Sequence, residues 1–246
     1  MNELEFYDKV GEVNGWDFSH LQMETEGMKW EFYEEVMKRS KRSDVLLDIG
    51  TGGGENVLRI ASSLMFLVGI DFSTGMMETA RSNLRKSKAL NVRFSQMSAD
   101  DLQFPVGFFD IVSACHAPFV STEVFKVLKK GGIFFTQQVS EADKLNVKTA
   151  FGRGQSFGEV DGTLKERYVT ELYDAGFTEV QSFEYDAIDY YKRPEDLIFL
   201  LQHTPIIPDF GKRERDLDSL NEFIQNNQTK KGIRTNSKRF LLVANK

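Results

Sequence analysis

The stretch from Val45 to Ala61, VLLDIGTGGGENVLRIA, constrains the fold more than any other part of the sequence. A short apolar run ends at Asp48, four of the five residues from Gly50 to Gly54 are glycine, and a helix-like pattern follows. Glycine destabilises regular structure, because it has the most backbone freedom to lose. A glycine-rich turn from a strand into a helix therefore predicts a place where the backbone closely approaches a nucleotide-like ligand.

Strand patterns and helix patterns alternate from residue 44 onward. Such alternation predicts a mostly parallel sheet with helices on both faces. Later in the chain, two further strand patterns can form a long antiparallel pair at one edge of that sheet. We therefore expect a Rossmann-like, doubly wound α/β fold with an antiparallel C-terminal strand. The seven expected strands cover residues 44–50, 66–71, 91–97, 108–115, 133–139, 178–191 and 238–245.

The length of the chain suits one domain, so we expect residues 1–246 to fold as a single unit. Residues 1–42 and residues 193–236 lack strand periodicity. We expect the first to be an N-terminal helical cap and the second a helical insertion before the last strand. Both would lie over the carboxyl ends of the strands, where open α/β sheets bind ligands.

Composition narrows the expected compartment and partners. The single cysteine, Cys115, excludes an internal disulfide and fits a reducing cytoplasm. The N-terminus MNELEFYDKV lacks the apolar core of a signal peptide, and the longest apolar stretch, LMFLVGI, is too short to span a bilayer. A formal net charge of −6 argues against a broad nucleic-acid surface, although basic groups occur at residues 38–42 and 230–239. We expect a cytoplasmic protein with no membrane segment.

The glycine loop departs from two common phosphate-binding motifs. A P-loop, G-x-x-x-x-G-K-[ST], needs a second glycine where this chain has Glu55, and the lysine that should follow is absent. The dinucleotide fingerprint, G-x-G-x-x-G, also needs glycine at that position. A carboxylate in the first helical turn would repel a pyrophosphate. The pattern that fits is an acid followed by G-x-G-x-G, which here comprises Asp48, Gly50, Gly52 and Gly54.

This pattern resembles the first motif of the class I S-adenosylmethionine-dependent methyltransferases, of the UbiE-like type that acts on small molecules. The resemblance covers most of residues 44–140. It implies a ligand without phosphate, whose ammonium and sulfonium groups are attracted by acids and carbonyls. It also implies that the loop, Thr51 included, forms a wall against S-adenosyl-L-methionine and its product S-adenosyl-L-homocysteine. Asp48 would then lie at the amino-acid end of this cofactor.

Three later segments resemble the same family in the same order. VGIDFSTGMMETAR puts Asp71 at the end of the second strand, where the family's acid accepts both ribose hydroxyls. The resemblance also implies that Phe72 and Met76 pack against adenine. SADDLQFPVGFFDIV resembles the stretch that reads the adenine edge, which implies roles for Ser98 (in place of the usual acid), Ala99 and Asp100. EVFKVLKKGGIFFTQQ, further along the chain, resembles the family's next helix, the turn after it and the fifth strand.

The residues that act on the substrate should follow the fourth strand, in SACHAPF. Methyl transfer from a positively charged sulfur needs mainly near-attack geometry, and a base only where the acceptor is protonated. His116 is the candidate catalytic base or substrate-orienting residue, because a histidine pKa near neutral suits that task. The alternative is an ordinary hydrogen-bonded surface histidine. Cys115 should line the cofactor cleft, and the further candidate substrate contacts are Trp16 and Gln137.

A second motif in the sequence is typical of a different class of enzyme. GQSFG places Ser156 in a G-x-S-x-G pattern, the nucleophile elbow of α/β hydrolases, but that elbow needs a strand before it and a helix after it. Neither flank has the required pattern, so a flexible lid loop is expected instead. His20, Cys115, His116 and His203 lack metal-ligand spacing, so no metal site is expected. The sequence also leaves open the possibility that the protein binds the cofactor without catalysing a reaction.

The sequence therefore predicts an S-adenosylmethionine-dependent methyltransferase with a small-molecule acceptor. The alternative acceptor is RNA or protein, engaged by the local basic groups. The sequence leaves open the acceptor atom, the use of a general base and the oligomeric state. It also leaves open whether residues 193–236 form a lid or an interface.

Overall fold

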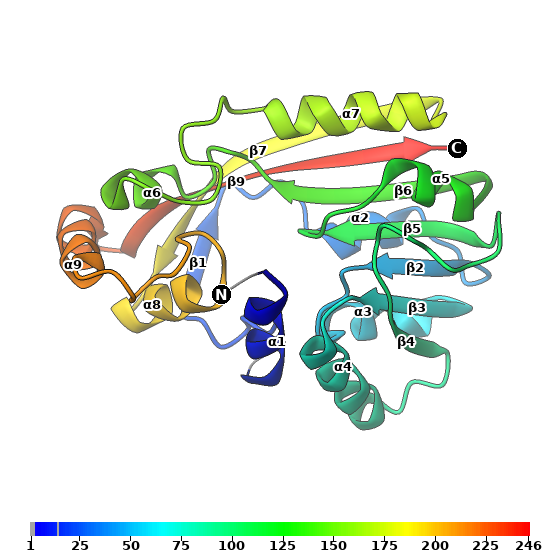
Figure 1. Ribbon diagram of the computed structural model, residues 1–246, viewed down its shortest axis with the longest axis horizontal. Helices are drawn as coiled ribbons and strands as arrows, with labels where there is room; N and C mark the ends of the chain where they lie inside the picture. Colours follow the sequence, from blue (N-terminus) through cyan, green and yellow to red (C-terminus); the bar gives the residue numbers. More distant parts are fainter. Residues whose placement is uncertain (1–2, 14) are drawn as a thin grey trace.

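The computed structural model describes residues 3–13 and 15–246, which build one sheet flanked by helices (Figure 1). The strand order is β1-β7-β9-β6-β5-β2-β3-β4, with β8 paired to β9. Within this order, β6, β5, β2, β3 and β4 are parallel to one another, in the Rossmann-like arrangement that the alternating pattern predicted. Their bounds are β2 Val45–Ile49, β3 Phe66–Asp71, β4 Val92–Gln96, β5 Phe109–Cys115 and β6 Leu128–Val139.

A long antiparallel unit extends the parallel part of the sheet. It consists of β7 (Glu179–Tyr191) and β9 (Gly232–Asn245). β9 lies between β6 and β7 and is antiparallel to both. The expected antiparallel C-terminal strand is therefore confirmed, together with its pairing to the strand predicted at residues 178–191.

The expectation of seven strands is wrong, because the described residues form nine. β1 (Met23–Glu26) falls in the expected helical cap and pairs with β7, and β8 (Gln228–Thr229) pairs with β9. Both pair with the parts of β7 and β9 that extend past the end of β6. The backbone groups of β7 and β9 need hydrogen-bond partners there. Periodicity cannot reveal them, since all four residues of β1 are exposed and β8 has only two residues. β9 also begins at Gly232 rather than at residue 238, so residues 193–236 are not helical throughout.

Helices cover both faces of the parallel strands, as expected. In β2 every residue is buried, and alternate residues face different cores, with Leu46 on one side and Leu47 on the other. The core around Leu46 is covered by α2 and α3, and the core around Leu47 by α5 and α7. The bounds are α2 Phe32–Lys38, α3 Glu55–Ile60 with a 3₁₀ turn at Ala61–Ser63, α5 Ser121–Val127 and α7 Thr163–Ala175.

A third, smaller core lies at the end of β7 and β9 that is remote from the C-terminus. There α6, α8 and α9 pack against Tyr191 and Ile233, and Figure 1 shows the three helices together beyond the parallel strands. Lys144 and Asp189 form a buried ion pair nearby. The helices span α6 Leu145–Phe151, α8 Pro194–His203 and α9 Asp216–Asn227.

The N-terminal helix α1 (Glu3–Val13) packs closely on α4 (Thr74–Ser87). A Cβ atom on Gly11 would lie 2.4 Å from the backbone nitrogen of Met76, so only glycine permits this approach. The Thr79 hydroxyl donates a hydrogen bond to the Gly11 carbonyl at 2.7 Å. These contacts hold the N-terminal segment beside the carboxyl end of β3, where α4 begins.

Candidate functional site

A cavity opens at the carboxyl ends of β2, β3 and β5, with about 640 Å³ of empty space, part of it open to solvent. The structure brings together residues from the glycine loop, the second and third motifs, the SACHAPF segment and the N-terminal cap. Nine sequence-predicted site residues line the cavity: Trp16, Gly50, Gly52, Asp71, Phe72, Met76, Ala99, Cys115 and His116.

The glycine loop forms one wall of the cavity through its backbone. Gly50, Gly52 and Gly54 all have positive φ, at 68°, 57° and 75°, a conformation that favours glycine. A Cβ atom on Gly50 would lie 2.2 Å from the Cβ of Ala117, and one on Gly54 would lie 2.5 Å from the ring of Phe94. The loop therefore needs glycine both for its turn and for its close neighbours. Gly54 serves the turn and does not line the cavity.

Asp48 lies beneath the cavity rather than on its wall. Its side chain is completely buried and accepts hydrogen bonds from Ser113 Oγ at 2.6 Å and from the Tyr33 hydroxyl at 3.3 Å. Burial raises the pKa of Asp48 to about 7, although the Ser113 hydrogen bond acts in the opposite direction. The nearby Thr51 amide donates to Ile70 O at 2.9 Å, which joins the loop to β3. Neither Asp48 nor Thr51 lines the cavity.

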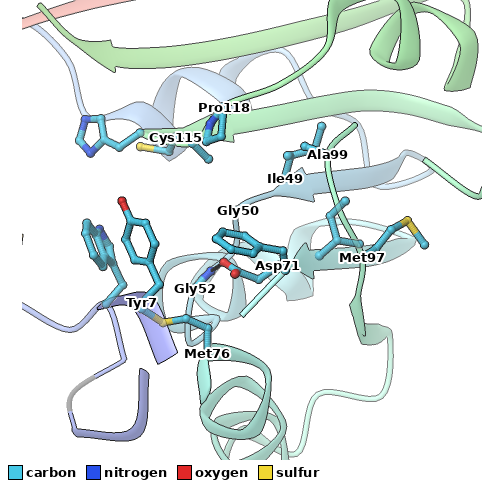
Figure 2. A pocket seen from close by; sticks show the side chains of 15 residues that line it. Tyr7, Ile49, Gly50, Gly52, Asp71, Met76, Met97, Ala99, Cys115 and Pro118 are labelled. Atoms are coloured by element: carbon cyan, nitrogen blue, oxygen red, sulfur yellow. Dashed lines mark hydrogen bonds between the residues drawn. The ribbon is translucent and has the colours of Figure 1, made fainter. Parts of the chain in front are cut away.

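Asp71 is the carboxylate that reaches the cavity wall (Figure 2). Its two oxygens accept backbone hydrogen bonds at 3.0 Å, Oδ2 from Gly52 N–H and Oδ1 from Ser73 N–H. Burial raises the pKa of Asp71, while these two hydrogen bonds oppose that shift. A carboxylate oxygen has two acceptor sites, so each oxygen can accept one further hydrogen bond. The geometry suits a pair of neighbouring hydroxyl groups.

The region near the ends of β3 and β4 provides an apolar surface. Phe72, Met76 and Ala99, which the resemblance implied as cofactor contacts, line the cavity, and Met97 lines it as well. Ser98 and Asp100, which were also expected here, lie outside the lining. They are exposed and bond to each other, with Ser98 Oγ donating to Asp100 Oδ2 at 3.3 Å. The sequence pattern could not identify Met97, because it lies before the motif and looks like an ordinary strand residue.

The N-terminal segment closes one side of the cavity. Tyr7 and Trp16 line it with ring centroids 5.9 Å apart, and Figure 2 shows the Tyr7 ring projecting into the cavity. The Trp16 amide donates to Glu55 Oε1 at 3.3 Å. Glu55 thus anchors the N-terminal segment to the glycine loop and does not itself line the cavity. Trp16, an expected substrate contact, is therefore among the residues of the cavity wall.

His116 and Gln137 lie together at the ends of β5 and β6. His116 has a φ of 54°, and its backbone N–H donates to Gln137 O at 2.8 Å. His116 is one of the residues that line the cavity, and its Nε2 lies 3.1 Å from Gln137 Nε2. Gln137, an expected substrate contact, lies behind His116 and does not line the cavity. Burial lowers the pKa of His116 to about 3, so the ring is neutral at physiological pH.

Cys115 lines the cavity as expected, beside Pro118 in Figure 2. Its thiol lies 3.7 Å from Gln137 Nε2, and burial raises its pKa well above the usual range. Thiolate is the reactive form of cysteine, so this group is chemically inert at neutral pH. A buried, unreactive thiol agrees with the expectation that Cys115 is a part of the cavity wall.

The rival motif at Ser156 lacks the context of a nucleophile elbow. The segment follows α6, which ends at Phe151, and precedes α7, which begins at Thr163, so no strand leads into it. Ser156 lines a separate cavity with Lys148. Among residues 3–13 and 15–246, no group of three or more His, Cys, Asp or Glu side chains could hold a metal ion.

Comparison with known proteins decides which family this site belongs to. Residues 46–132 match the family model of a methyltransferase domain. Over these residues the chain carries a methyltransferase domain. The expectation from the sequence motifs is therefore confirmed for the family. Across the described part of the chain, the methyltransferase domain and its flanks contain no helix that is both long and apolar enough to cross a membrane.

Two curated relatives share part of the methyltransferase domain. The uncharacterised methyltransferase YcgJ of Bacillus subtilis is 34% identical over 96 residues, which make up 36% of this chain and 38% of that protein. The demethylmenaquinone methyltransferase of Lactococcus lactis is 32% identical over 97 residues, or 35% of this chain and 38% of that protein. The match thus covers well under half the length of each relative.

Solved structures agree with the fold over most of the chain. The YcgJ protein aligns with a TM-score of 0.60 and 20% identity, covering 87% of this chain and 97% of that chain. A functionally unknown protein from Deinococcus radiodurans aligns with a TM-score of 0.63 and 16% identity, covering 98% of both chains. At these identities the comparison concerns the fold alone.

Proposed function

We propose that this protein is an enzyme that binds S-adenosyl-L-methionine in the cavity and transfers its methyl group to a small molecule. The observation that carries the proposal is the charge of the cavity lining. Among the described residues that line it, Asp71 is the acidic side chain, none is Lys or Arg, and the one histidine is neutral. Such a wall favours a cationic ligand without phosphate over a pyrophosphate.

The proposed cofactor contacts follow from the geometry of the wall. Asp71 would accept the two ribose hydroxyls with the acceptor sites that its backbone donors leave available. Phe72 and Met97 would hold adenine between apolar surfaces. The backbone of Gly50 and Gly52 would lie against the amino-acid part. Asp48 would lie beneath the loop without contacting the cofactor. A nearby cation would favour the ionised form of this buried carboxyl group.

When bound, S-adenosyl-L-methionine supplies a methyl group activated by a positively charged sulfur. The protein then has to position the acceptor and exclude water, which is where most of the catalysis can arise. Tyr7 and Trp16 cover the cavity on the side of α1, and Cys115 and Pro118 bound it on the side of β5. His116 would orient the acceptor, since a ring with a pKa of about 3 is a weak base at neutral pH.

A small-molecule acceptor agrees with two further observations. The covering of the cavity by Tyr7 and Trp16 leaves restricted space for a polymer. The basic residues that could attract RNA are partly neutralised, because Lys231 pairs with Glu26, and Lys38 pairs with Glu35 at 2.5 Å. The name of one relative, a demethylmenaquinone methyltransferase, also supports a small-molecule acceptor here.

This proposal can be tested with S-adenosyl-L-methionine that carries a radioactive methyl group. The protein is incubated separately with a pool of cellular metabolites, with tRNA and rRNA, and with cellular protein. We expect label to be transferred in the metabolite pool, with little in the other two. Labelled RNA or protein would overturn the small-molecule acceptor. Cofactor binding without transfer in any pool would favour the non-catalytic alternative.

A further inference from the structure

A chain of side-chain hydrogen bonds leads from the N-terminal segment to the histidine of the cavity. Trp30 Nε1 donates to Gln137 Oε1 at 2.7 Å, and Gln137 Nε2 lies 3.1 Å from His116 Nε2. The second hydrogen of the same amide nitrogen is directed to Cys115 Sγ at 3.7 Å. Trp30, Gln137 and His116 come from three separate parts of the chain, 107 and 21 residues apart along it.

The chemistry of the indole fixes the direction of this chain. An indole N–H can only donate, so the Gln137 atom that faces Trp30 must be the carbonyl oxygen. The amide nitrogen, which is a donor, therefore faces His116. A donor at 3.1 Å requires a lone pair on His116 Nε2, and the neutral ring then carries its proton on Nδ1. A flipped amide would set its NH₂ group against the indole N–H.

The surroundings keep the three groups in place. Trp30 packs edge-on against Tyr185, with ring centroids 4.6 Å apart, and Gln137 is buried on β6. The backbone hydrogen bond from His116 N–H to Gln137 O ties the two residues together. Arg239, on β9, disfavours a positive charge on His116 and is itself paired with Asp143. An imidazolium would also place an N–H against the Gln137 amide donor.

The geometry points to Gln137, oriented by Trp30, as a positioning residue that holds His116 as the neutral Nδ1–H tautomer. Within residues 3–13 and 15–246, Nδ1 has no hydrogen-bond partner, so this N–H is the group that His116 can offer to a ligand. His116 is then a hydrogen-bond donor and not a proton acceptor. Resting on the proposed function, this assigns an acceptor molecule with an oxygen lone pair, such as a phenolate, enolate or carbonyl, beside the methylated atom.

Nuclear magnetic resonance of ¹⁵N-labelled protein tests the tautomer directly. The chain has three histidines, so the His116 signals are identified by their loss in the His116→Asn variant. We expect a single tautomer protonated at Nδ1 that does not become charged between pH 8 and about pH 5. An Nε2–H tautomer, a mixture of tautomers or titration near the usual histidine pKa of about 6.5 would overturn the assignment.

Variants of the chain separate positioning from general damage to the fold. In Gln137→Glu a carboxylate accepts from both Trp30 and His116, so the proton should move to Nε2 and the pKa of His116 should rise toward or above 6.5. In Trp30→Phe the amide loses its orienting donor, and both tautomers should appear.

Gln138→Leu is the matched control, because Gln138 is equally buried on β6 but donates to Ala117 O and Thr136 Oγ1. Its His116 tautomer should match that of the unmodified protein.

These measurements need no cofactor, so they are independent of the proposed function. If the tautomer is as expected but S-adenosyl-L-homocysteine fails to bind, the proposed function is wrong and the positioning role stands. If the cofactor product binds and His116 carries its proton on Nε2, the positioning role is wrong and the proposed function stands. A tautomer unchanged in Gln137→Glu would also refute the role of Gln137.

Discussion

Between pH 4 and pH 7, the protein should lose about 4 kcal/mol more unfolding free energy than its Asp48→Asn variant. The native pKa of Asp48 is about 7, because the carboxyl group is completely buried, whereas the unfolded value is near 3.9. Between these values the native state keeps a proton that the unfolded state has released. Stability therefore falls by about 1.4 kcal/mol for each pH unit in this window.

Urea denaturation at several pH values measures this difference. Asp101→Asn is a suitable control, since it makes the same charge change at an exposed position. Its stability curve should run parallel to that of the unmodified protein. If the Asp48→Asn curve is also parallel, then the native carboxyl group ionises at its ordinary pKa, and the account of Asp48 as a desolvated group beneath the loop is wrong.

Asp71→Ala should weaken the binding of S-adenosyl-L-homocysteine roughly 10- to 150-fold, which corresponds to about 1.5–3 kcal/mol for lost hydrogen bonds to a charged group. The physical reason is that Asp71 is the carboxylate of the cavity wall, held by Gly52 N–H and Ser73 N–H. Isothermal titration calorimetry gives the dissociation constants of the two proteins.

The same substitution removes an acceptor from the glycine loop, so a loosened loop could also weaken binding. Asp71→Asn separates the two causes, because its carbonyl oxygen can still accept from one backbone donor. We expect Asp71→Asn to keep the thermal stability better than Asp71→Ala while still losing affinity. Asp101→Ala should bind like the unmodified protein. Equal affinity in Asp71→Ala would mean that the ribose does not lie against this side chain.

The parallel part of the fold could be predicted because its signals are local. An apolar strand, a glycine turn and a helix follow one another within Val45–Ala61, and Gly50, Gly52 and Gly54 of that turn have the positive φ that favours glycine. Asp71 could be predicted for the same reason, since it ends an apolar strand. β1 could not be predicted, because its exposed residues carry no pattern. It forms a strand by pairing with the edge of β7, which is distant in the sequence.

The details of the site depend on contacts between distant residues, which the sequence does not reveal. Asp48 was expected to contact the cofactor, yet its oxygens are taken by Ser113 and Tyr33 from other elements. Gln137 was expected to contact the substrate, yet Trp30 and His116 occupy its amide. In both cases a motif placed the residue close to the cavity, and tertiary hydrogen bonds decided which way its side chain turned.

The identity of the ligand is the central claim, and calorimetric titration of the unmodified protein tests it most directly. S-adenosyl-L-homocysteine and NAD are titrated separately into the same preparation. We predict saturable heat with S-adenosyl-L-homocysteine and none with NAD, because the described residues of the lining offer a carboxylate and no Lys or Arg for a pyrophosphate. Binding of NAD without binding of S-adenosyl-L-homocysteine would contradict the account.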